Sequence, residues 1–361
     1  MPADPEVLWQ IPLAHPGLGG LAVSGNRLLF GDRDLDDFHD VFRCLDADSG
    51  EPVWEIQRLA IAALDYGNSP RATPLVDKDR VYFASAHGLV LCAKLSDGSV
   101  IWERNLHDDF PPAAELPWGF CASPLLVAGK LIVNPGSPTA SVVALDAVTG
   151  EVVWKCPGVA PGYGSLIAAA FQGQQQIIGH DAVSLGGWDV ETGRRLWTVT
   201  PESSGDFNVP TPVVLKDQLL IATENNGARL FRFEADGRIA AEPFASNSRL
   251  KPDMSTPAVV GGKLFCVNRF LYCLDVDDGL KELWRLRDAA FGDYAAVFVS
   301  EDRLLILANG ELLLVPTSGK KQITSRCRIF DDNHPIYSHA ALRGKRLFVR
   351  GEGLLKCLNL W

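Results

Sequence analysis

A short phrase that ends in tryptophan recurs along the chain and constrains its fold more than any other feature. The best copies occupy residues 45–54, 145–154 and 188–197, with weaker copies at 95–102 and 274–284. The closing aromatic residues stand 40 to 52 residues apart and are Trp9, Trp54, Trp102, Trp154, Trp197, Phe244, Trp284 and Phe330. This interval is typical of the four-stranded blades of a β-propeller and is too long for leucine-rich or ankyrin repeats.

Most repeats also contain two alternating apolar runs joined by a tight polar turn. These pairs of runs occupy residues 74–83, 124–133, 212–222, 257–267, 296–307 and 341–349. Strict alternation on both sides of a polar reversal predicts a β-hairpin, here the inner two strands of each blade. The Asp-x-x-x-Gly part of the phrase then forms the turn between the outer strands, because Asp bonds its own backbone and Gly accepts a positive φ. We expect the following Trp to be buried between adjacent blades.

The ends of the chain predict how the propeller closes. Trp9 precedes any inner hairpin, whereas the last hairpin has almost no chain after it. The first strand should therefore complete the last blade, with Trp9 in the same sheet as Cys357, which leaves no open edge. We predict an all-β, eight-bladed β-propeller of four-stranded antiparallel blades in one domain, residues 1–361. A β-sandwich with incidental periodicity is the alternative, but a sandwich has no reason to repeat a whole phrase.

Composition and charge exclude several classes of partner. A net charge of −10 repels phosphate backbones and anionic lipids, so we expect no nucleic-acid partner. No apolar run approaches the roughly 18 residues of a membrane span, so we expect no membrane insertion. The first residues lack the basic and apolar parts of a secretory signal. The sequence as it stands therefore indicates a cytoplasmic protein, or a periplasmic or extracytoplasmic one if a signal segment was trimmed.

Four of the eight cysteines recur at one strand position of the repeat: Cys44, Cys92, Cys273 and Cys357. Equivalent positions on neighbouring blades lie too far apart for a disulfide, so no bridge should join any two of these four. Cys266 and Cys273 share a hairpin, but a two-residue turn at Asn268 and Arg269 would place Cys266 opposite Leu271. Buried free thiols suit a reducing compartment, which mildly favours the cytoplasm.

Residues 144–154 match every fixed position of the Ala-x-Asp-x-x-Thr-Gly-x-x-x-Trp docking motif of quinoprotein alcohol dehydrogenases. The chain thus resembles the PQQ-like β-propeller repeat family, and its modest length resembles the non-catalytic, BamB-like branch. The resemblance implies a motif that locks blades together. Catalytic members carry adjacent cysteines over the quinone, a calcium ion and an aspartate base. This sequence has no Cys-Cys dipeptide and no alignable catalytic motif, so we expect no enzyme activity, no cofactor and no catalytic or metal-binding residues.

The variable chemistry lies on the face of the blade-to-blade connections and middle-strand turns, because the inner hairpin turns and the Asp-x-x-x-Gly turns on the other face are short. Loops on a rigid scaffold are where recognition usually lies. In these connections an aromatic residue repeatedly stands beside a small or polar one just before an inner strand, and basic residues follow nearby. We therefore predict a binding site of Tyr66, Asn68, Arg71, Trp118, Phe120, Tyr163, Phe207, Asn208, Arg249, Lys251, Tyr294, Tyr337 and His339 around the mouth of the central channel. The alternative is that each aromatic plugs the channel or covers its own blade.

Other polar clusters suggest chemistry only weakly. Residues 32–40 place carboxylates at alternate positions, as calcium loops do, but lack the glycine and glutamate of an EF-hand, so a solvated acidic turn is expected. Residues 107–109 and 331–334 contain metal-capable side chains without zinc-site spacing, and His180 with Asp181 lacks a nucleophile. The aspartates that could serve a quinone are spread over five connections: Asp65, Asp109, Asp206, Asp253 and Asp293.

These observations lead to one favoured function and two alternatives. We predict a monomeric, non-catalytic scaffold that presents its loop-rich face to a protein or peptide partner. The first alternative is a quinone-dependent or other small-molecule oxidoreductase with its site at the channel mouth. The second is a sensor module of a larger chain. Fold alone does not choose among them, since function resides in sites built on the fold.

Overall fold

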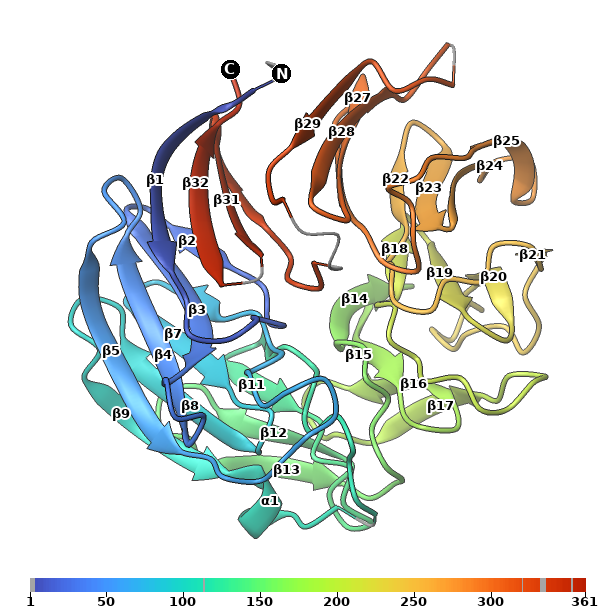
Figure 1. Cartoon of the computed structure of the whole chain (residues 1–361). Helices are drawn as coiled ribbons and strands as arrows, with labels where there is room; N and C mark the ends of the chain where they lie inside the picture. Colours follow the sequence, from blue (N-terminus) through green and yellow to red (C-terminus); the bar gives the residue numbers. More distant parts are fainter. Residues whose placement is uncertain (1–3, 113, 320, 332–335, 352) are drawn as a thin grey trace. The chain divides into compact units, whose positions relative to one another are not determined.

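The computed structural model describes residues 4–112, 114–319, 321–331, 336–351 and 353–361. These residues form eight four-stranded antiparallel sheets, which confirms the predicted class of an eight-bladed β-propeller (Figure 1). The chain also divides into two compact units with four blades each. The first unit comprises Pro5–Pro161 and Tyr337–Trp361, and the second comprises Met1–Asp4 and Gly162–Ile336.

The first unit contains the N-terminal and C-terminal strands, three complete sequential blades and one short helix. Its elements are β1 (Glu6–Pro12), β2 (Ala22–Ser24), β3 (Arg27–Arg33), β4 (His39–Asp46), β5 (Pro52–Leu59), β6 (Leu75–Asp77), β7 (Arg80–Ala84), β8 (Leu89–Lys94), β9 (Val100–Asn105), α1 (Leu106–Asp109), β10 (Leu125–Val127), β11 (Lys130–Val133), β12 (Val142–Asp146), β13 (Val152–Cys156), β30 (Ala341–Arg343), β31 (Arg346–Gly351) and β32 (Leu354–Asn359).

The second unit contains four sequential blades. Its elements are β14 (Ile167–Phe171), β15 (Gln174–His180), β16 (Leu185–Asp189), β17 (Arg195–Val199), β18 (Val213–Leu215), β19 (Gln218–Thr223), β20 (Gly227–Arg232), β21 (Ala245–Asn247), β22 (Ala258–Val260), β23 (Lys263–Asn268), β24 (Phe270–Asp275), β25 (Lys281–Leu286), β26 (Ala296–Val299), β27 (Arg303–Ala308), β28 (Glu311–Pro316) and β29 (Ser325–Arg328).

The predicted closure is confirmed. Strand β1 pairs antiparallel with β32, and Trp9 lies directly opposite Cys357. The sheet order is β1, β32, β31 and β30, so the first strand becomes the outer strand of the last blade (Figure 1). The two ends of the chain thus share one hydrogen-bonded ladder, and this blade cannot form until the C-terminal hairpin has been made.

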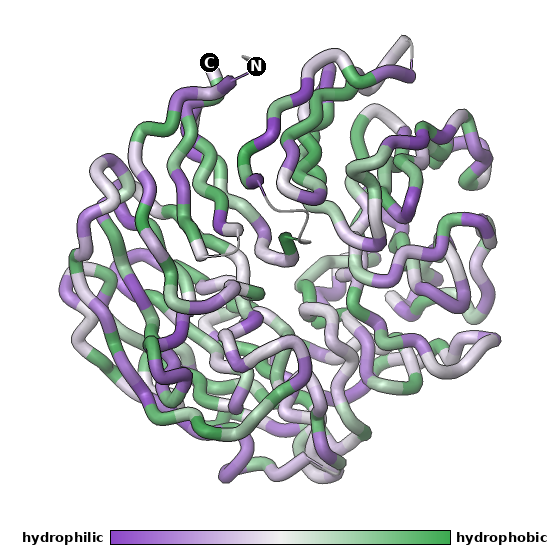
Figure 2. The backbone as a smooth tube through the Cα atoms, in the orientation of Figure 1, coloured by the Kyte–Doolittle hydropathy of each residue, from purple (hydrophilic) through white to green (hydrophobic). Residues whose placement is uncertain are grey.

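Hydrophobic cores lie between neighbouring blades. One of them joins Leu29 and Phe42 of the β2–β5 blade to Val81 and Phe83 of the β6–β9 blade. The rings of Phe42 and Phe83 have centroids 4.9 Å apart. Hydrophobic residues run through the strands, while hydrophilic residues recur at the turns (Figure 2). A single blade would leave one of these faces in water, so the blades are stable only when stacked.

Within the first unit, the repeated phrase docks three tryptophans, Trp9, Trp54 and Trp102, onto the next blade. In the turn after β4, the Asp46 carboxylate accepts the backbone N–H groups of Asp48 and Ser49, both at 3.0 Å. The turn ends at Gly50, whose φ is 78°. The Trp9 ring lies against this glycine, and a Cβ added there would come within 2.7 Å of it.

The same arrangement repeats in the next two blades. Added Cβ atoms at Gly98 and Gly150 would come within 2.8 Å of Trp54 and 2.6 Å of Trp102. The indole N–H groups donate to carbonyl oxygens of the neighbouring blade, from Trp54 to Leu95 at 3.1 Å and from Trp102 to Ala147 at 3.2 Å. Each tryptophan therefore bonds and packs against the same turn of its neighbour.

The second unit replaces one of these direct contacts by a relay. The indole N–H of Trp197 donates to the Gln176 side chain of its own blade at 2.6 Å. The Gln176 amide in turn donates to the carbonyl of Gly237 in the next blade, also at 2.6 Å. The relay occurs where the repeated phrase is weakest. The turn at residues 235–237 is shorter than the Asp-x-x-x-Gly turns of the repeated phrase.

The recurring cysteines stand beside the docking tryptophans. Cys44, Cys92 and Cys273 lie directly opposite Trp54, Trp102 and Trp284 in their sheets. The position must be small because the indole covers it. All eight cysteines are free thiols, and burial raises the pKa of Cys44 to about 12 and of Cys92, Cys273 and Cys357 to about 11. Such thiols are unreactive near neutral pH.

The expected register of the Cys266 hairpin is wrong by one residue. Cys266 lies opposite Tyr272 rather than Leu271, because the reversal needs only Arg269, with a φ of 56°. Cys273 lies opposite Phe265, so the two cysteines are not cross-strand partners in either register.

We expect Gly150→Ala to lower the free energy of unfolding by about 2–4 kcal/mol. The positive φ alone costs about 1–2 kcal/mol for alanine, and forcing a methyl group into the Trp102 ring adds about 1–3 kcal/mol. Gly129→Ala is the matched control, because Gly129 has a φ of 73° but no atom within 4 Å of an added Cβ. Chemical denaturation measures both variants, and equal losses would contradict the docking role of Gly150.

Candidate functional site

The loops of the first unit collect at one end of its blades. Each connection leaves the outer strand of one blade and enters the inner strand of the next, so it lies at the same end as the turn between the two middle strands. In the β2–β5 blade this end carries residues 34–38 and 60–74, and in the β6–β9 blade it carries residues 85–88 and 106–124. This is the face on which the sequence predicted the binding residues.

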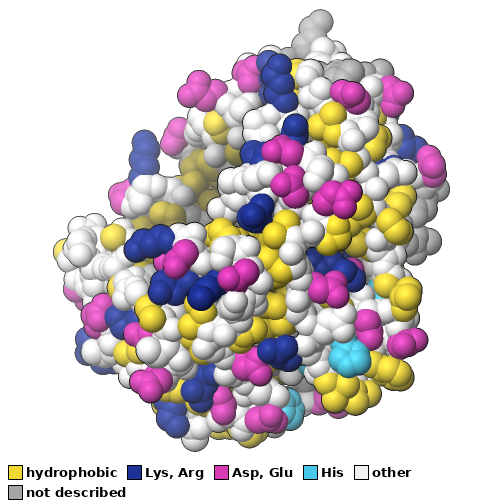
Figure 3. All heavy atoms as spheres, turned by 90° about the vertical axis from the view of Figure 1, so that its left-hand side faces the viewer, with side chains coloured by type: hydrophobic (Ala, Val, Ile, Leu, Met, Phe, Trp, Pro, Cys, Tyr) yellow, Lys and Arg dark blue, Asp and Glu magenta, His cyan; other side chains and the backbone are white. Residues whose placement is uncertain are grey.

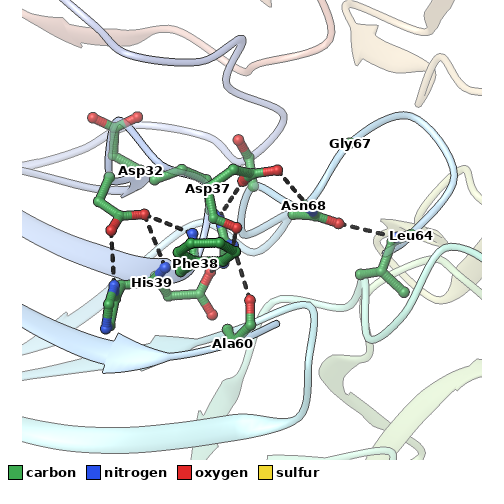
Figure 4. A network of polar contacts seen from close by, with 12 residues as sticks. Asp32, Asp37, Phe38, His39, Ala60, Leu64, Gly67 and Asn68 are labelled. Atoms are coloured by element: carbon green, nitrogen blue, oxygen red, sulfur yellow. Dashed lines mark hydrogen bonds and ion pairs between the residues drawn. The ribbon is translucent and has the colours of Figure 1, made fainter. Parts of the chain in front are cut away.

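A buried arginine joins two of these loops. The guanidinium of Arg33 is fully buried and donates to the carboxylates of Asp37 at 2.7 Å and Asp40 at 2.9 Å. It also donates to the carbonyl of Ala60 at 2.8 Å, where the chain leaves β5 (Figure 4). Asp40 is itself buried and accepts the Ser85 hydroxyl of the next blade. These contacts fix the middle turn against the connection that follows it.

The prediction that the acidic turn at residues 32–40 is solvated is wrong for the two carboxylates at its ends. Asp32 and Asp40 are each only 1% exposed. Asp32 accepts Arg43 at 3.1 Å and the fully buried Arg350 at 3.4 Å. The carboxylates are neutralised by arginines from β3, β4 and β31, because a buried carboxylate needs a charged partner. Burial lowers the pKa of Arg350 to about 10.

The predicted polar residues Asn68 and Arg71 shape the loop that carries Tyr66. Asn68 accepts the Leu64 N–H at 3.0 Å and donates to Asp37 at 2.6 Å, as Figure 4 shows. Arg71 donates to the carbonyls of Ser69 and Asp65 at 2.7 Å and of Gly67 at 2.9 Å. The guanidinium thus closes the loop around itself, and Tyr66 at its tip has a φ of 65°.

Three predicted aromatics of the first unit lie together, and we call them the aromatic cluster. The ring of Tyr66 meets Trp118 and Tyr337 edge to face, with centroids 6.3 Å apart in both pairs. Tyr66 is 71% exposed, whereas the other two are half-buried. A second link comes from the Asp65 N–H, which donates to the Pro117 carbonyl at 2.9 Å. The cluster therefore joins three segments that are distant in sequence.

An apolar groove of about 680 Å³ lies beside the aromatic cluster. One wall is residues 59–64, which include the last residue of β5 and the chain after it, and the other is residues 111–116 without residue 113. The floor includes His87 and Phe120. The backbone N–H of Phe120 donates to the Ala86 carbonyl at 2.9 Å. The His87 Nε2 donates to the Ala62 carbonyl at 2.7 Å and so ties the first wall to the floor. In Figure 3, hydrophobic side chains gather beside histidines near the lower margin of the face shown.

His339 is the remaining predicted site residue of the first unit. Its side chain is exposed, and its carbonyl accepts the Leu21 N–H at 3.0 Å. The residue therefore helps to hold the entry to β2, and the sequence was right to place it on a loop near an inner strand.

In the second unit, three predicted residues lie on two paired loops. The N–H of Tyr163 donates to the Phe207 carbonyl at 3.2 Å, and that of Gly164 donates to the Asn208 carbonyl at 2.7 Å. Phe207 is 53% exposed. Asn208 is buried, with a φ of 57° and a side chain that donates to Asp181 and Asp206 carbonyls at 3.2 and 3.3 Å, so it supports the loop.

The other predicted residues of this unit do not form a common cluster in the contacts described. The exposed Arg249 lies 3.8 Å from Glu282. The exposed Lys251 accepts the Asn268 amide through its carbonyl. Tyr294 is half-buried, and burial raises its pKa.

His180 lies at the end of β15 in a small pocket whose polar side chains are Ser184, Asn208 and Arg229 and whose remaining lining is apolar. The space inside is about 10 Å³, enough for one water molecule. Burial, reinforced by the charge of Arg229, lowers the pKa of His180 to about 4, against the smaller opposing effects of Asp206 and Asp181. The predicted structural role of the His180 and Asp181 pair fits this interior position, since Asp181 holds Arg195 at 2.6 Å.

The other polar candidates do not assemble a metal site in the part of the chain that the structure describes. No three His, Cys, Asp or Glu side chains among those residues gather closely enough to hold an ion. At residues 107–109, His107 lies 3.9 Å from Asp108, while Asp109 is held by Arg104 at 2.7 Å. Of residues 331–334, only Asp331 lies within the described residues. Within those same residues, no helix has the length and apolar character needed to cross a membrane.

Sequence reasoning missed the apolar groove and the buried arginines. A signal for the groove was available, because residues 59–64 read Leu-Ala-Ile-Ala-Ala-Leu in a connection that should be polar. Leu59 and Ile61 are 66% and 62% exposed. Arg350 carries no local signal, because its partner Asp32 lies in another blade, whereas the partners of Arg33 lie in its own hairpin.

We expect the stability of the protein to fall between about pH 6.5 and pH 4 because of His180. Its folded pKa of about 4 lies below the ordinary 6.5, so the unfolded chain binds a proton first and the stabilisation is complete only above pH 6.5. The shift corresponds to about 3 kcal/mol. Urea denaturation at several pH values measures it, and His180→Gln should flatten the wild-type slope across this window. A variant with the wild-type slope would disprove the assignment.

Comparisons with known proteins place the fold among several kinds of protein. No curated protein matches the sequence. The crystal structure of BamB from Moraxella catarrhalis superposes with a TM-score of 0.66 at 14% identity, over 98% of this chain and 97% of that one. Quinohemoprotein alcohol dehydrogenase from Comamonas testosteroni gives 0.68 at 11%, over 99% and 77%. The computationally designed Ika8 protein gives 0.64 at 12%, over 98% and 99%. At these identities the likeness shows the fold alone.

The sequence profile of one family matches directly. The profile described as outer membrane protein assembly factor BamB covers residues 2–113 and 39–285, which together exceed half of the chain. The docking motif at residues 144–154, the eight blades and the closure by β1 agree with this match. The chain therefore belongs to the PQQ-like β-propeller family of the outer membrane protein assembly factor BamB.

Proposed function

We propose that this protein is a non-catalytic binding module that takes a protein or peptide partner at the loop-rich end of its first unit. The observation that carries the proposal is the aromatic cluster, in which Tyr66 stands 71% exposed between Trp118 and Tyr337. Exposed aromatics on a rigid support are typical anchors of protein interfaces, because they bury a large area at little cost in conformational entropy.

The residues around the aromatic cluster favour an anchor for a binding partner over a side chain that only fills the central channel. Hydrogen bonds of Asn68 and Arg71 fix the backbone of the loop that carries Tyr66, so the loop presents the ring in one orientation. The positive φ of Tyr66 is costly for a residue with a Cβ, and strain of this kind is concentrated at functional sites. The proposal extends to the paired loops of Tyr163, Phe207 and Asn208 as the corresponding surface of the second unit.

We expect Tyr66→Ala to weaken partner binding by at least about thirtyfold, since loss of a central aromatic anchor costs about 2 kcal/mol or more. Chemical crosslinking in the source cells, followed by affinity isolation, identifies the partner, and titration calorimetry measures its affinity. The matched control is Trp361→Ala, because Trp361 is 48% exposed and follows β32 at the end of the blade opposite the loops. Equal binding by the Tyr66 and Trp361 variants would refute the proposal.

The competing oxidoreductase is favoured by the likeness to quinohemoprotein alcohol dehydrogenase. Bound quinone needs a cation at its carbonyl and a nearby base. Among the described residues, no group of three acidic, histidine or cysteine side chains offers such a cation site. We expect added pyrroloquinoline quinone with calcium to show no saturable binding and no alcohol-dependent dye reduction. Saturable binding abolished by changing Asp206 or Asp293 would instead establish the enzyme.

A further inference from the structure

We propose that the apolar groove binds an extended apolar peptide segment whose ends carry lysine or arginine. This inference rests on the proposed binding function and names the chemistry of the partner. The groove is separate from the aromatic cluster but shares the connection of residues 111–120 with it, so one chain can contact both.

The walls of the groove are apolar and already solvent-exposed. Leu59, the last residue of β5, and Ile61, just after it, are 66% and 62% exposed. Opposite them lie Pro111, Pro112 and Leu116. The volume of about 680 Å³ lies within the usual range of about 300–1,000 Å³ for binding pockets. An occupant that covers these side chains gains free energy in proportion to the apolar area removed from water.

Main-chain groups along the first wall point to a peptide. The backbones of Ile61 and Ala63 make no hydrogen bond to other described residues, whereas the intervening Ala62 carbonyl accepts His87. Unpaired N–H and C=O groups beside an apolar surface are satisfied well by an extended chain, which offers both donors and acceptors at the spacing of a strand. A lipid tail would leave those groups without partners.

The rim of the groove carries two acidic groups: Asp65, whose charge interacts with that of Arg71, and Glu115, which forms no ion pair with a described residue. Glu115 is exposed on the second wall, and Asp65 is exposed where the first wall ends. The basic side chains nearby are engaged: Arg104 with Asp109 at 2.7 Å, Arg58 with Glu103 at 2.8 Å, and Arg71 with loop carbonyls. The rim therefore complements a segment flanked by lysine or arginine and opposes one flanked by acids.

The test uses fluorescence polarisation with labelled synthetic peptides and the full-length protein. One peptide carries a leucine, valine and isoleucine core between lysines, and its counterpart has glutamates in place of the lysines. We expect the lysine peptide to bind wild-type protein at least about tenfold more tightly, with a preference that shrinks as salt is added. Equal binding of the two peptides would overturn the inference.

Two variants locate the binding, and each has a control on the turns between outer strands. Ile61→Asp should weaken binding of the lysine peptide at least about tenfold. Its control, Val148→Asp, should leave binding unchanged, because Asp48 already occupies the equivalent position of another repeat. Glu115→Lys should reverse the preference toward the glutamate peptide, whereas Glu51→Lys should not, because Arg194 occupies that position in a third repeat. Thermal unfolding verifies that each variant is folded.

The outcomes separate this inference from the proposed function. If partner binding depends on Tyr66 but neither peptide binding nor partner binding responds to Ile61→Asp, the groove inference fails and the proposed function stands. If the lysine peptide binds through Ile61 while the cellular partner ignores Tyr66, the aromatic anchor fails and the groove inference stands. Vesicles of anionic or neutral lipid that compete with the peptide and bind through Ile61 would overturn the peptide assignment in favour of a membrane surface.

Discussion

The contact of a tryptophan with a glycine of the next blade is the interaction on which the blades of the first unit depend. It couples three requirements in one turn: the aspartate that accepts backbone N–H groups, the glycine that adopts positive φ, and the bare Cα that admits an indole ring. The indole N–H then bonds the residue after that aspartate in the first and third of these contacts, Ala47 and Ala147. Because one turn serves both its own hairpin and its neighbour, local and interblade stability cannot be separated.

This coupling explains why the repeated phrase can be recognised in the sequence and where it is lost. At Trp197 the neighbouring turn is shorter, and Gln176 bridges the remaining distance to Gly237. The glutamine is fully buried, and both ends of its amide are bonded, so its hydrogen bonds offset the cost of removing the amide from water. A repeat can therefore lose its phrase without losing its blade, provided that another strand supplies the missing hydrogen bond.

The fold could be predicted from sequence in nearly all its architecture, because spacing, turn chemistry and closure are local or periodic properties. The placement of Trp9 in the blade of Cys357 follows from counting repeats, and the structure confirms it. The candidate site was only partly predictable. Aromatics on connections were visible, and Tyr66, Trp118 and Tyr337 do meet. The roles of Asn68 and Arg71 were not visible, because they depend on which carbonyls and carboxylates three separate segments bring within 3 Å.

The largest error is also the most instructive in physical terms. An acidic run such as residues 32–40 usually lies in water, yet Asp32 and Asp40 are buried. Arg33 comes from the same hairpin, but Arg350 comes from the last blade, over three hundred residues away in sequence. Removing one partner of such a pair would leave a buried charge, which typically costs about 3–5 kcal/mol. The loop-rich end of the first unit is thus held by ion pairs that demand a fixed geometry, while its apolar side chains are left in water. Rigid polar support beneath exposed apolar groups is the arrangement expected of a surface whose partner is another molecule, because the ordering cost has been met before binding begins.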